Sequence, residues 1–185
     1  MIIQPMSDTA TASFTASALH GIAPLPHLGV IRAHGEDAAH FLQGQLTQDV
    51  TGLKPGQARL AALCNPKGRM LASFQVLRRA DDELLLVTSA DTLAATLKRL
   101  SMFVLRARLK LSDATAELAL RGLLGNATTS VAAGAHQTSA GAQNDPAFTI
   151  SLPAADGAPR VLWLAAAGTP PPAGAELSEA DWLAA

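Results

Sequence analysis

The order of short apolar segments between residues 27 and 111 constrains the fold more than any other feature of this sequence. Apolar runs at residues 27–32, 58–64, 70–77 and 84–87 are separated by turn residues and are short enough to be strands. Apolar residues that recur every three or four positions, over 38–46 and 93–104, indicate two helices. With a further strand at 105–111, the predicted order is β-α-β-β-β-α-β.

A shorter version of this pattern follows. We expect strands at 117–123, 148–152 and 161–165, a weak helix at 126–133 and a last helix that begins at Ser178. The predicted parts are a flexible lead-in (1–24), a first α+β unit (25–112) and a second α+β unit (113–185) that lacks its closing strand. The sequence thus predicts an α+β fold of two split-βαβ (ferredoxin-like) units with mainly antiparallel sheets. The incomplete second unit suggests a truncated chain or a strand supplied from elsewhere.

Composition excludes several classes of protein. With 49% hydrophobic and 16% charged residues among 185, the chain is not expected to be disordered. A single cysteine excludes a disulfide framework, and the five histidines do not have the spacing of a zinc site. The sequence has no apolar run of about 20 residues and no secretory signal, so we expect a cytoplasmic protein.

Positive charge is concentrated in the middle of the chain. Residues 54–110 have a net charge of +7, although the whole chain has a net charge of −1. This segment either faces an anionic partner or is balanced in space by the acidic segments on both sides of it. Alternation over residues 105–111 predicts a half-buried strand with Arg106, Arg108 and Lys110 on its open face.

The residues alone do not predict a catalytic site. Glycine-rich phosphate loops and nucleophile motifs are absent, and a lone Cys64 at the end of a strand is more typical of packing. Polar side chains gather at two places, the helix end from Gln43 to Asp49 and the hairpin tip from Asn65 to Arg69. Such groups can contact a heterocycle edge and an anionic tail, but ordinary helix-end and turn chemistry explains them as well.

Three motifs in order resemble one known family. They are Gly35-Glu36-Asp37-Ala38 with Phe41 to Val50, then Asn65-Pro66-Lys67-Gly68-Arg69-Met70, then Leu97-Lys98-Arg99-Leu100 with Arg106 to Leu111. Together they resemble the N-terminal part of the YgfZ-like branch of the glycine-cleavage T-protein (aminomethyltransferase) superfamily. The resemblance covers residues 25–112 well and the remainder in outline.

The resemblance implies a T-protein-like fold in which three domains surround a tetrahydrofolate site, and the C-terminal barrel domain would be absent from this chain. T-protein is an aminomethyltransferase, whereas YgfZ-like proteins are folate-binding factors in iron–sulfur cluster assembly or repair and indirectly support tRNA modification. The implied cofactor is tetrahydrofolate, which a truncated chain could have lost, and the implied partners are iron–sulfur enzymes or assembly factors. The implied folate-facing residues are Leu28, Gln45, Thr47, Gln48, Asp49, Val50, Asn65, Met70 and Thr88. Contacts with an anionic tail or RNA would come from Lys67, Arg69, Arg106, Arg108 and Lys110.

Two departures from the family pattern bear on activity. Ala72 and Ser73 stand where T-protein has an acidic pair beside the reactive folate nitrogen, so the electrostatic anchor for group transfer is missing. The Lys-Gly-Cys-x-x-Gly-Gln-Glu motif of YgfZ-like proteins is also absent from this sequence. We therefore expect a folate-binding accessory protein without catalytic or metal-binding residues. The alternatives are an aminomethyltransferase, which Ala72 and Ser73 disfavour, and a basic RNA-binding module, which would lack aromatic residues for stacking on its strand.

Overall fold

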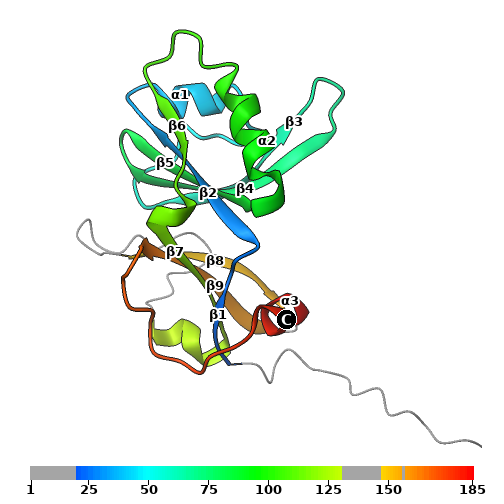
Figure 1. Ribbon diagram of the computed structural model, residues 1–185, viewed down its shortest axis with the longest axis vertical. Coiled ribbons are helices and arrows are strands. Elements are labelled where there is room, and N and C mark those ends of the chain that lie inside the picture. Colours follow the sequence, from blue (N-terminus) through cyan, green and yellow to red (C-terminus); the bar gives the residue numbers. More distant parts are fainter. Residues whose placement is uncertain (1–19, 131–146, 156) are drawn as a thin grey trace, which may run out of the picture.

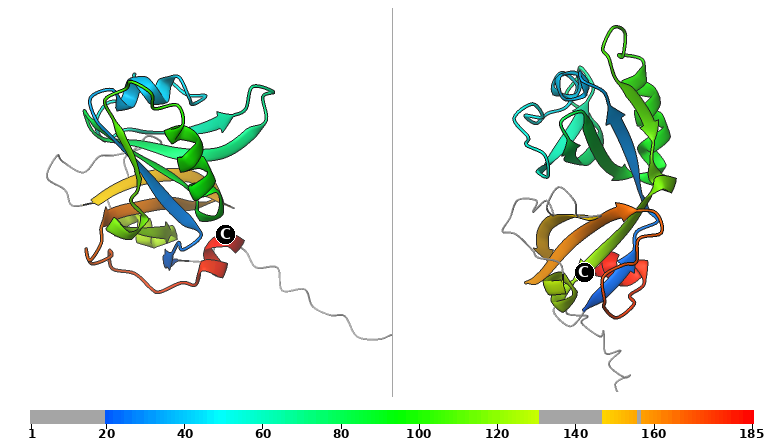
Figure 2. Two further views of the ribbon diagram at one scale, coloured as in Figure 1. Left: turned by 45° about the horizontal axis from the view of Figure 1, so that its top comes forward. Right: turned by 90° about the vertical axis from the view of Figure 1, so that its left-hand side faces the viewer.

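The computed structural model describes residues 20–130, 147–155 and 157–185, and in it two antiparallel sheets lie face to face (Figures 1 and 2). The larger sheet has the strand order β3-β4-β5-β2-β6. Its strands are β2 (Leu28–His34), β3 (Ala58–Cys64), β4 (Met70–Ala80), β5 (Glu83–Ser89) and β6 (Lys110–Asp113). Two helices, α1 (Ala38–Gln43) and α2 (Ala90–Ser101), cover the face that points away from the second sheet.

The smaller sheet has the order β1-β7-β9-β8. Its strands are β1 (Gly21–Pro24), β7 (Leu118–Leu124), β8 (Ala147–Ala155) and β9 (Ala158–Ala166). Two short 3-10 turns, Thr115–Glu117 and Gly125–Ser130, flank β7, and the helix α3 (Glu179–Ala184) closes one end. None of the helices in the described part of the chain is long and apolar enough to cross a membrane.

The apolar strand β5 explains why the sheets stack. Leu84 and Leu86 belong to the core beneath α1 and α2, whereas Leu85 and Val87 belong to the core between the two sheets. A strand that is apolar on both faces must be covered on both sides, since successive side chains point in opposite directions. The predicted α+β class and the predicted element order of residues 28–113 are confirmed.

The start of the chain differs from the prediction. Residues 21–24 were expected in the lead-in, but they form β1, which pairs with β7 in the second sheet. The backbone of Ile22 also bonds to residues near the other end of the chain, donating to the Ala175 carbonyl at 2.8 Å and accepting from Leu177 at 2.9 Å. The second sheet therefore takes a strand from the segment that precedes the first unit. The rest of the predicted lead-in, residues 1–19, lies outside the described residues.

The predicted strand at 105–111 is wrong over residues 105–109. Only Lys110 and Leu111 lie in β6, because its partner β2 ends at His34, which pairs with Lys110. Beyond that point the backbone bonds elsewhere: the Arg108 N–H donates to the Asp37 carboxylate at 2.7 Å. The alternation in sequence thus predicted a strand that has no neighbour to pair with. The weak helix at 126–133 is a 3-10 turn over Gly125–Ser130, and residues 131–133 are outside the described range.

Candidate functional site

A hollow of about 370 Å³ opens where the two sheets meet α3. The larger sheet contributes Leu28, Ser73 and Thr88 to its lining, and Leu60 and Gln75 lie on the same side. The smaller sheet and α3 contribute Arg160 and Trp182. Apolar walls with a few polar groups and one cation are typical of a site for a small organic ligand.

Two of the implied folate-facing residues, Leu28 and Thr88, line this hollow. Thr88 is only 3% exposed, and its hydroxyl donates to the Ser73 carbonyl at 2.9 Å. Leu28 pairs with Ser89 at the first position of β2, so both residues lie at the same end of the larger sheet. The hydroxyl bond holds β4 against β5 at this end and fixes the wall of the hollow.

The opposite wall is built by two residues that sequence reasoning missed. The guanidinium of Arg160 lies 4.2 Å from the ring centroid of Trp182, which is a cation–π contact. Burial lowers the pKa of Arg160 from its ordinary value, because desolvation disfavours the charged form. The one available signal was a lone arginine in the apolar run of β9, and its role depends on Trp182, which lies 22 residues later in the sequence.

The helix that carries Trp182 is held in place at its start. The Ser178 hydroxyl accepts from the Asp181 N–H at 3.1 Å, and the Asp181 carboxylate accepts from the Ser178 N–H at 2.8 Å, which forms a capping box. The Ser178 hydroxyl also donates to the Asp181 carboxylate at 2.6 Å, and this bond, with the one from the Ser178 N–H, lowers the pKa of Asp181. Glu179 lies 2.6 Å from Nδ1 of His27, just before β2, so α3 is also tied to the larger sheet.

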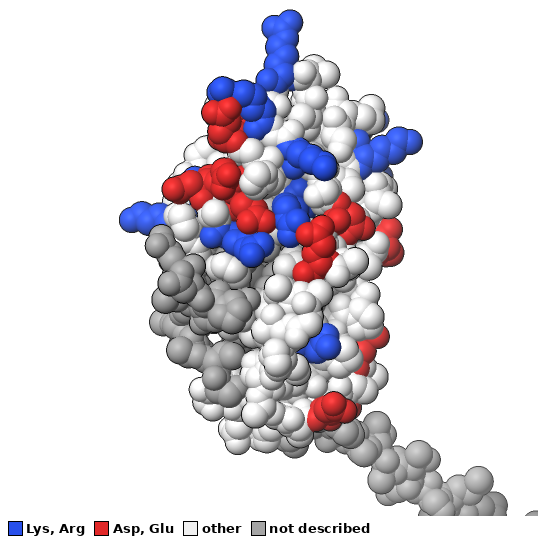
Figure 3. Space-filling model, turned by 60° about the vertical axis from the view of Figure 1, so that its left-hand side comes forward, with Lys and Arg blue, Asp and Glu red and all other residues white. Residues whose placement is uncertain are grey.

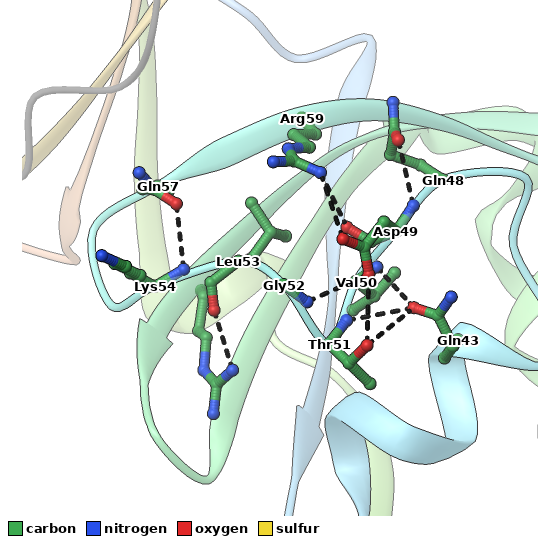
Figure 4. A network of polar contacts seen from close by, with 11 residues as sticks. Gln43, Gln48, Asp49, Val50, Thr51, Gly52, Leu53, Lys54, Gln57 and Arg59 are labelled. Carbon is green, nitrogen blue, oxygen red and sulfur yellow. Dashed lines mark hydrogen bonds and ion pairs between the residues drawn. The ribbon is translucent and has the colours of Figure 1, made fainter.

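The glutamine-rich end of α1 forms an internal polar network (Figure 4). Oε1 of Gln43 accepts from the N–H groups of Val50 at 2.7 Å and Thr51 at 3.0 Å. The Asp49 carboxylate accepts from the Gly52 N–H and the Thr51 hydroxyl, and these bonds, assisted by the positive charge of Arg59, lower the pKa of Asp49. The geometry therefore gives these oxygen atoms a structural role, since they hold the loop that leads to β3.

The remaining helix-end positions lie beside β3. Leu46 forms a bridge with Leu63, and the Thr47 hydroxyl accepts from the Ala62 N–H at 2.9 Å. Gln48 bonds to the neighbouring Asp49 N–H. Gln45 and Val50 flank these residues, and Val50 is fully buried. This segment adjoins the larger sheet but is not among the residues that line the hollow.

The hairpin tip has the turn geometry that its sequence predicts. Oδ1 of Asn65 accepts from the N–H groups of Lys67 at 2.9 Å and Arg69 at 3.0 Å, and Gly68 has a φ of 77°. Lys67 and Arg69 are exposed, and Met70 is 65% exposed. The tip projects from the larger sheet in Figure 1, and neither Asn65 nor Met70 lines the hollow.

The cations of residues 54–110 are balanced in part, since four of the eleven have an acidic partner among the described residues. Figure 3 shows lysine and arginine side chains interspersed with acidic ones over the half of the molecule that contains the larger sheet. Arg108 lies 2.6 Å from Glu36, and Arg79 lies 3.3 Å from Glu83. On the neighbouring strand β2, Arg32 pairs with Glu117 and Glu83, which raise its pKa. Arg106, Arg108 and Lys110 do not form the uniform cationic strand face that was predicted, because only Lys110 belongs to β6. Within the described residues there is no group of three metal-ligating side chains.

Comparisons with known proteins show which family the chain resembles. The family described as "GCVT N-terminal domain" matches residues 14–155. An aminomethyltransferase from Halalkalibacterium halodurans is 30% identical over 104 residues, which are 55% of this chain and 28% of the relative. The tRNA-modifying protein YgfZ from Colwellia psychrerythraea is 31% identical over 107 residues, which are 58% of this chain and 32% of the relative. The chain thus spans about a third or less of these curated relatives.

A solved structure extends the similarity to the fold. The glycine cleavage system aminomethyltransferase T from Bartonella henselae superposes with a TM-score of 0.66 at 21% identity. The superposition covers 81% of this chain and 43% of that protein. With two sheets in the arrangement of that structure and a family match over most of its length, the chain belongs to the GCVT N-terminal domain family.

Proposed function

We propose that this protein binds tetrahydrofolate in the hollow between its two sheets and acts as an accessory factor rather than as an aminomethyltransferase. The observation that supports this most directly is the position of Leu28 and Thr88. Both were implied as folate-facing by the family resemblance, and they lie in the wall of one hollow of ligand size.

The chemistry of the hollow suits a flat heterocycle. Its volume of about 370 Å³ lies in the lower part of the range for small-molecule sites, roughly 300–1,000 Å³. Leu28, Leu60 and Val87 offer apolar contact, while Ser73 and Gln75 offer hydroxyl and amide groups that can both donate and accept. A pterin ring has apolar faces and a polar edge, so it complements such a lining.

The same lining argues against aminomethyl transfer. Ser73 lines the hollow, whereas Ala72 is buried in the core beneath the helices. A transferase would need a carboxylate at this place to stabilise the positive charge that develops at the reacting nitrogen. A serine hydroxyl stays neutral and cannot supply that charge, so the hollow can bind a folate without activating it.

Calorimetric titration with tetrahydrofolate tests the binding. The wild type should bind, and Ser73→Phe should abolish binding because the new ring fills the hollow at an exposed position of β4. Ser101→Phe is the matched control, since Ser101 is an exposed residue on α2 outside the hollow. Absence of binding by the folded wild type, or equal binding by both variants, would contradict the proposal.

The accessory role is the second part of the proposal. Similarity to a tRNA-modifying protein supports a role in tRNA modification. The resemblance of the sequence motifs to the YgfZ-like branch adds iron–sulfur cluster assembly or repair in the cytoplasm, with iron–sulfur enzymes or assembly factors as partners. Loss of the protein should lower methylthiolated nucleosides in tRNA, measured by mass spectrometry. Restoration by the wild type but not by Ser73→Phe would support a role through the hollow, and unchanged nucleoside levels in the deletion strain would contradict it.

A further inference from the structure

We propose that Arg160 is the anion-binding residue of the hollow and pairs with a carboxylate that an amide links to an aromatic ring of the ligand. This inference rests on the proposed function, because it names the part of the folate that the wall formed by α3 and β9 would hold. It adds a residue to which neither the family motifs nor the sequence pattern assigns a role.

The first argument is that Arg160 lacks a counter-ion within the described part of the chain. Its Nη2 donates to the Trp182 carbonyl at a long 3.4 Å, and its buried Nε has no hydrogen-bond partner there. Burying a cation without a paired carboxylate is unfavourable, so such a group is usually completed by a partner. Here the space beside the guanidinium is the hollow itself, which Arg160 lines.

The second argument is that the position of Arg160 is fixed in advance. The cation–π contact places its guanidinium against the Trp182 ring, and Trp182 is itself 4% exposed and packed on Gly122. A pre-organised guanidinium loses less side-chain entropy when it binds a carboxylate, and its planar fork matches the two carboxylate oxygens. The ring thus holds the guanidinium at the wall of the hollow, which both residues line.

The third argument concerns the ligand class. Leu152 lines the same hollow as Arg160, so a ligand with an apolar ring joined to a carboxylate could contact both residues at once. The p-aminobenzoyl-glutamate half of a folate has this chemistry, whereas a free pterin does not. The pterin half would then lie toward the wall formed by Leu28 and Thr88.

The test compares Arg160→Gln with the wild type by titration with three probes: 5-formyltetrahydrofolate, the uncharged 6-methyltetrahydropterin, and p-aminobenzoyl-glutamate. Arg160→Gln should weaken binding of 5-formyltetrahydrofolate and of p-aminobenzoyl-glutamate at least tenfold and leave binding of the pterin unchanged. The affinity of Arg160→Lys for the two charged probes should lie between that of the wild type and that of Arg160→Gln, because lysine keeps the positive charge but lacks the planar guanidinium. Arg121→Gln is the control, because Arg121 is a cation of the same sheet that lines a different hollow.

The outcomes separate this inference from the proposed function. If the wild type and Arg160→Gln bound 5-formyltetrahydrofolate with equal affinity, the role of Arg160 would be overturned and the proposal of folate binding would stand. If only p-aminobenzoyl-glutamate bound, and did so in an Arg160-dependent manner, the anion site would stand without the proposed cofactor. If the folded wild type bound none of the three probes, both proposals would be wrong. Circular dichroism of each variant confirms that it is folded.

Discussion

Trp182 lies directly on the bare backbone of Gly122, and this contact joins the last helix to an interior strand of the smaller sheet. A Cβ atom at Gly122 would come within 3 Å of three ring carbons of Trp182. Ordinary packing does not permit that distance, so residue 122 must lack a side chain if α3 is to pack on the sheet. The same packing brings the Trp182 ring into contact with Arg160.

Gly122→Ala should therefore destabilise the protein by about 1–3 kcal/mol, the usual cost of overpacking a core. The midpoint of urea unfolding should fall without a change in slope. Gly44→Ala is the control, since a Cβ there would meet only the Phe41 carbonyl at 3.6 Å, an ordinary contact. Equal midpoints for the two variants would show that Trp182 does not pack on Gly122.

The stacked sheets should unfold as one unit. Leu84→Ala removes a side chain from the core beneath the helices, and Leu85→Ala removes one from the core between the sheets. Each should cost about 2–5 kcal/mol, as for other buried leucines. Both tryptophans, Trp163 and Trp182, report on the smaller sheet and α3. Leu84→Ala should shift the tryptophan fluorescence transition and the circular dichroism transition equally, and a fluorescence transition left in place would show that the sheets unfold separately.

Asp49 should contribute stability that depends on pH. Its pKa is lower in the folded protein than in the unfolded chain, chiefly because its carboxylate accepts from the Gly52 N–H. The contribution is therefore present above the unfolded pKa of about 4 and is lost as the pH falls through the folded pKa. Asp49→Asn should lower the urea midpoint at pH 7, and its difference from the wild type should shrink at pH 3. Glu176→Gln, at a carboxylate without an ion pair among the described residues, should show no such trend.

Ser178→Ala should lower the stability of α3. The loss of the capping box should cost about 1 kcal/mol. Because α3 carries Trp182, amide hydrogen exchange should accelerate at residues 181–184 and ligand affinity should fall with it. Ser101→Ala, whose hydroxyl donates to the Leu97 carbonyl on α2, should leave exchange in α3 unchanged. Unaltered exchange in the Ser178 variant would indicate that tertiary contacts alone hold the helix.

The parts of the fold that the sequence predicts well depend on local patterns. Leu84 to Val87 form a continuous apolar run, and Leu93, Leu97 and Leu100 repeat at helical spacing, so β5 and α2 could be placed from the residues alone. The turn at Asn65 also carries its own signal, because the side chain of this residue bonds to the backbone two and four positions later.

The parts that were missed depend on partners distant in sequence. β1 is too short to have a period, and it is a strand because β7 and the backbone near Leu177 pair with it. Residues 105–109 alternate as a strand should, but no partner strand reaches them. Arg160 contacts Trp182 because α3 packs on Gly122. These residues are far apart in the sequence, so no local pattern predicts the contact.

The early position of β1 in the sequence and its pairing with the later strand β7 bear on the order in which the sheets form during synthesis. Residues 21–24 leave the ribosome long before β7, so during synthesis this strand has no neighbour with which to form its hydrogen bonds. The larger sheet, by contrast, is complete once β6 has emerged. Synthesis from the N-terminus thus favours assembly of the larger sheet first. The backbone of the β1 segment stays hydrogen-bonded to water until β7 has been synthesised and can pair with it.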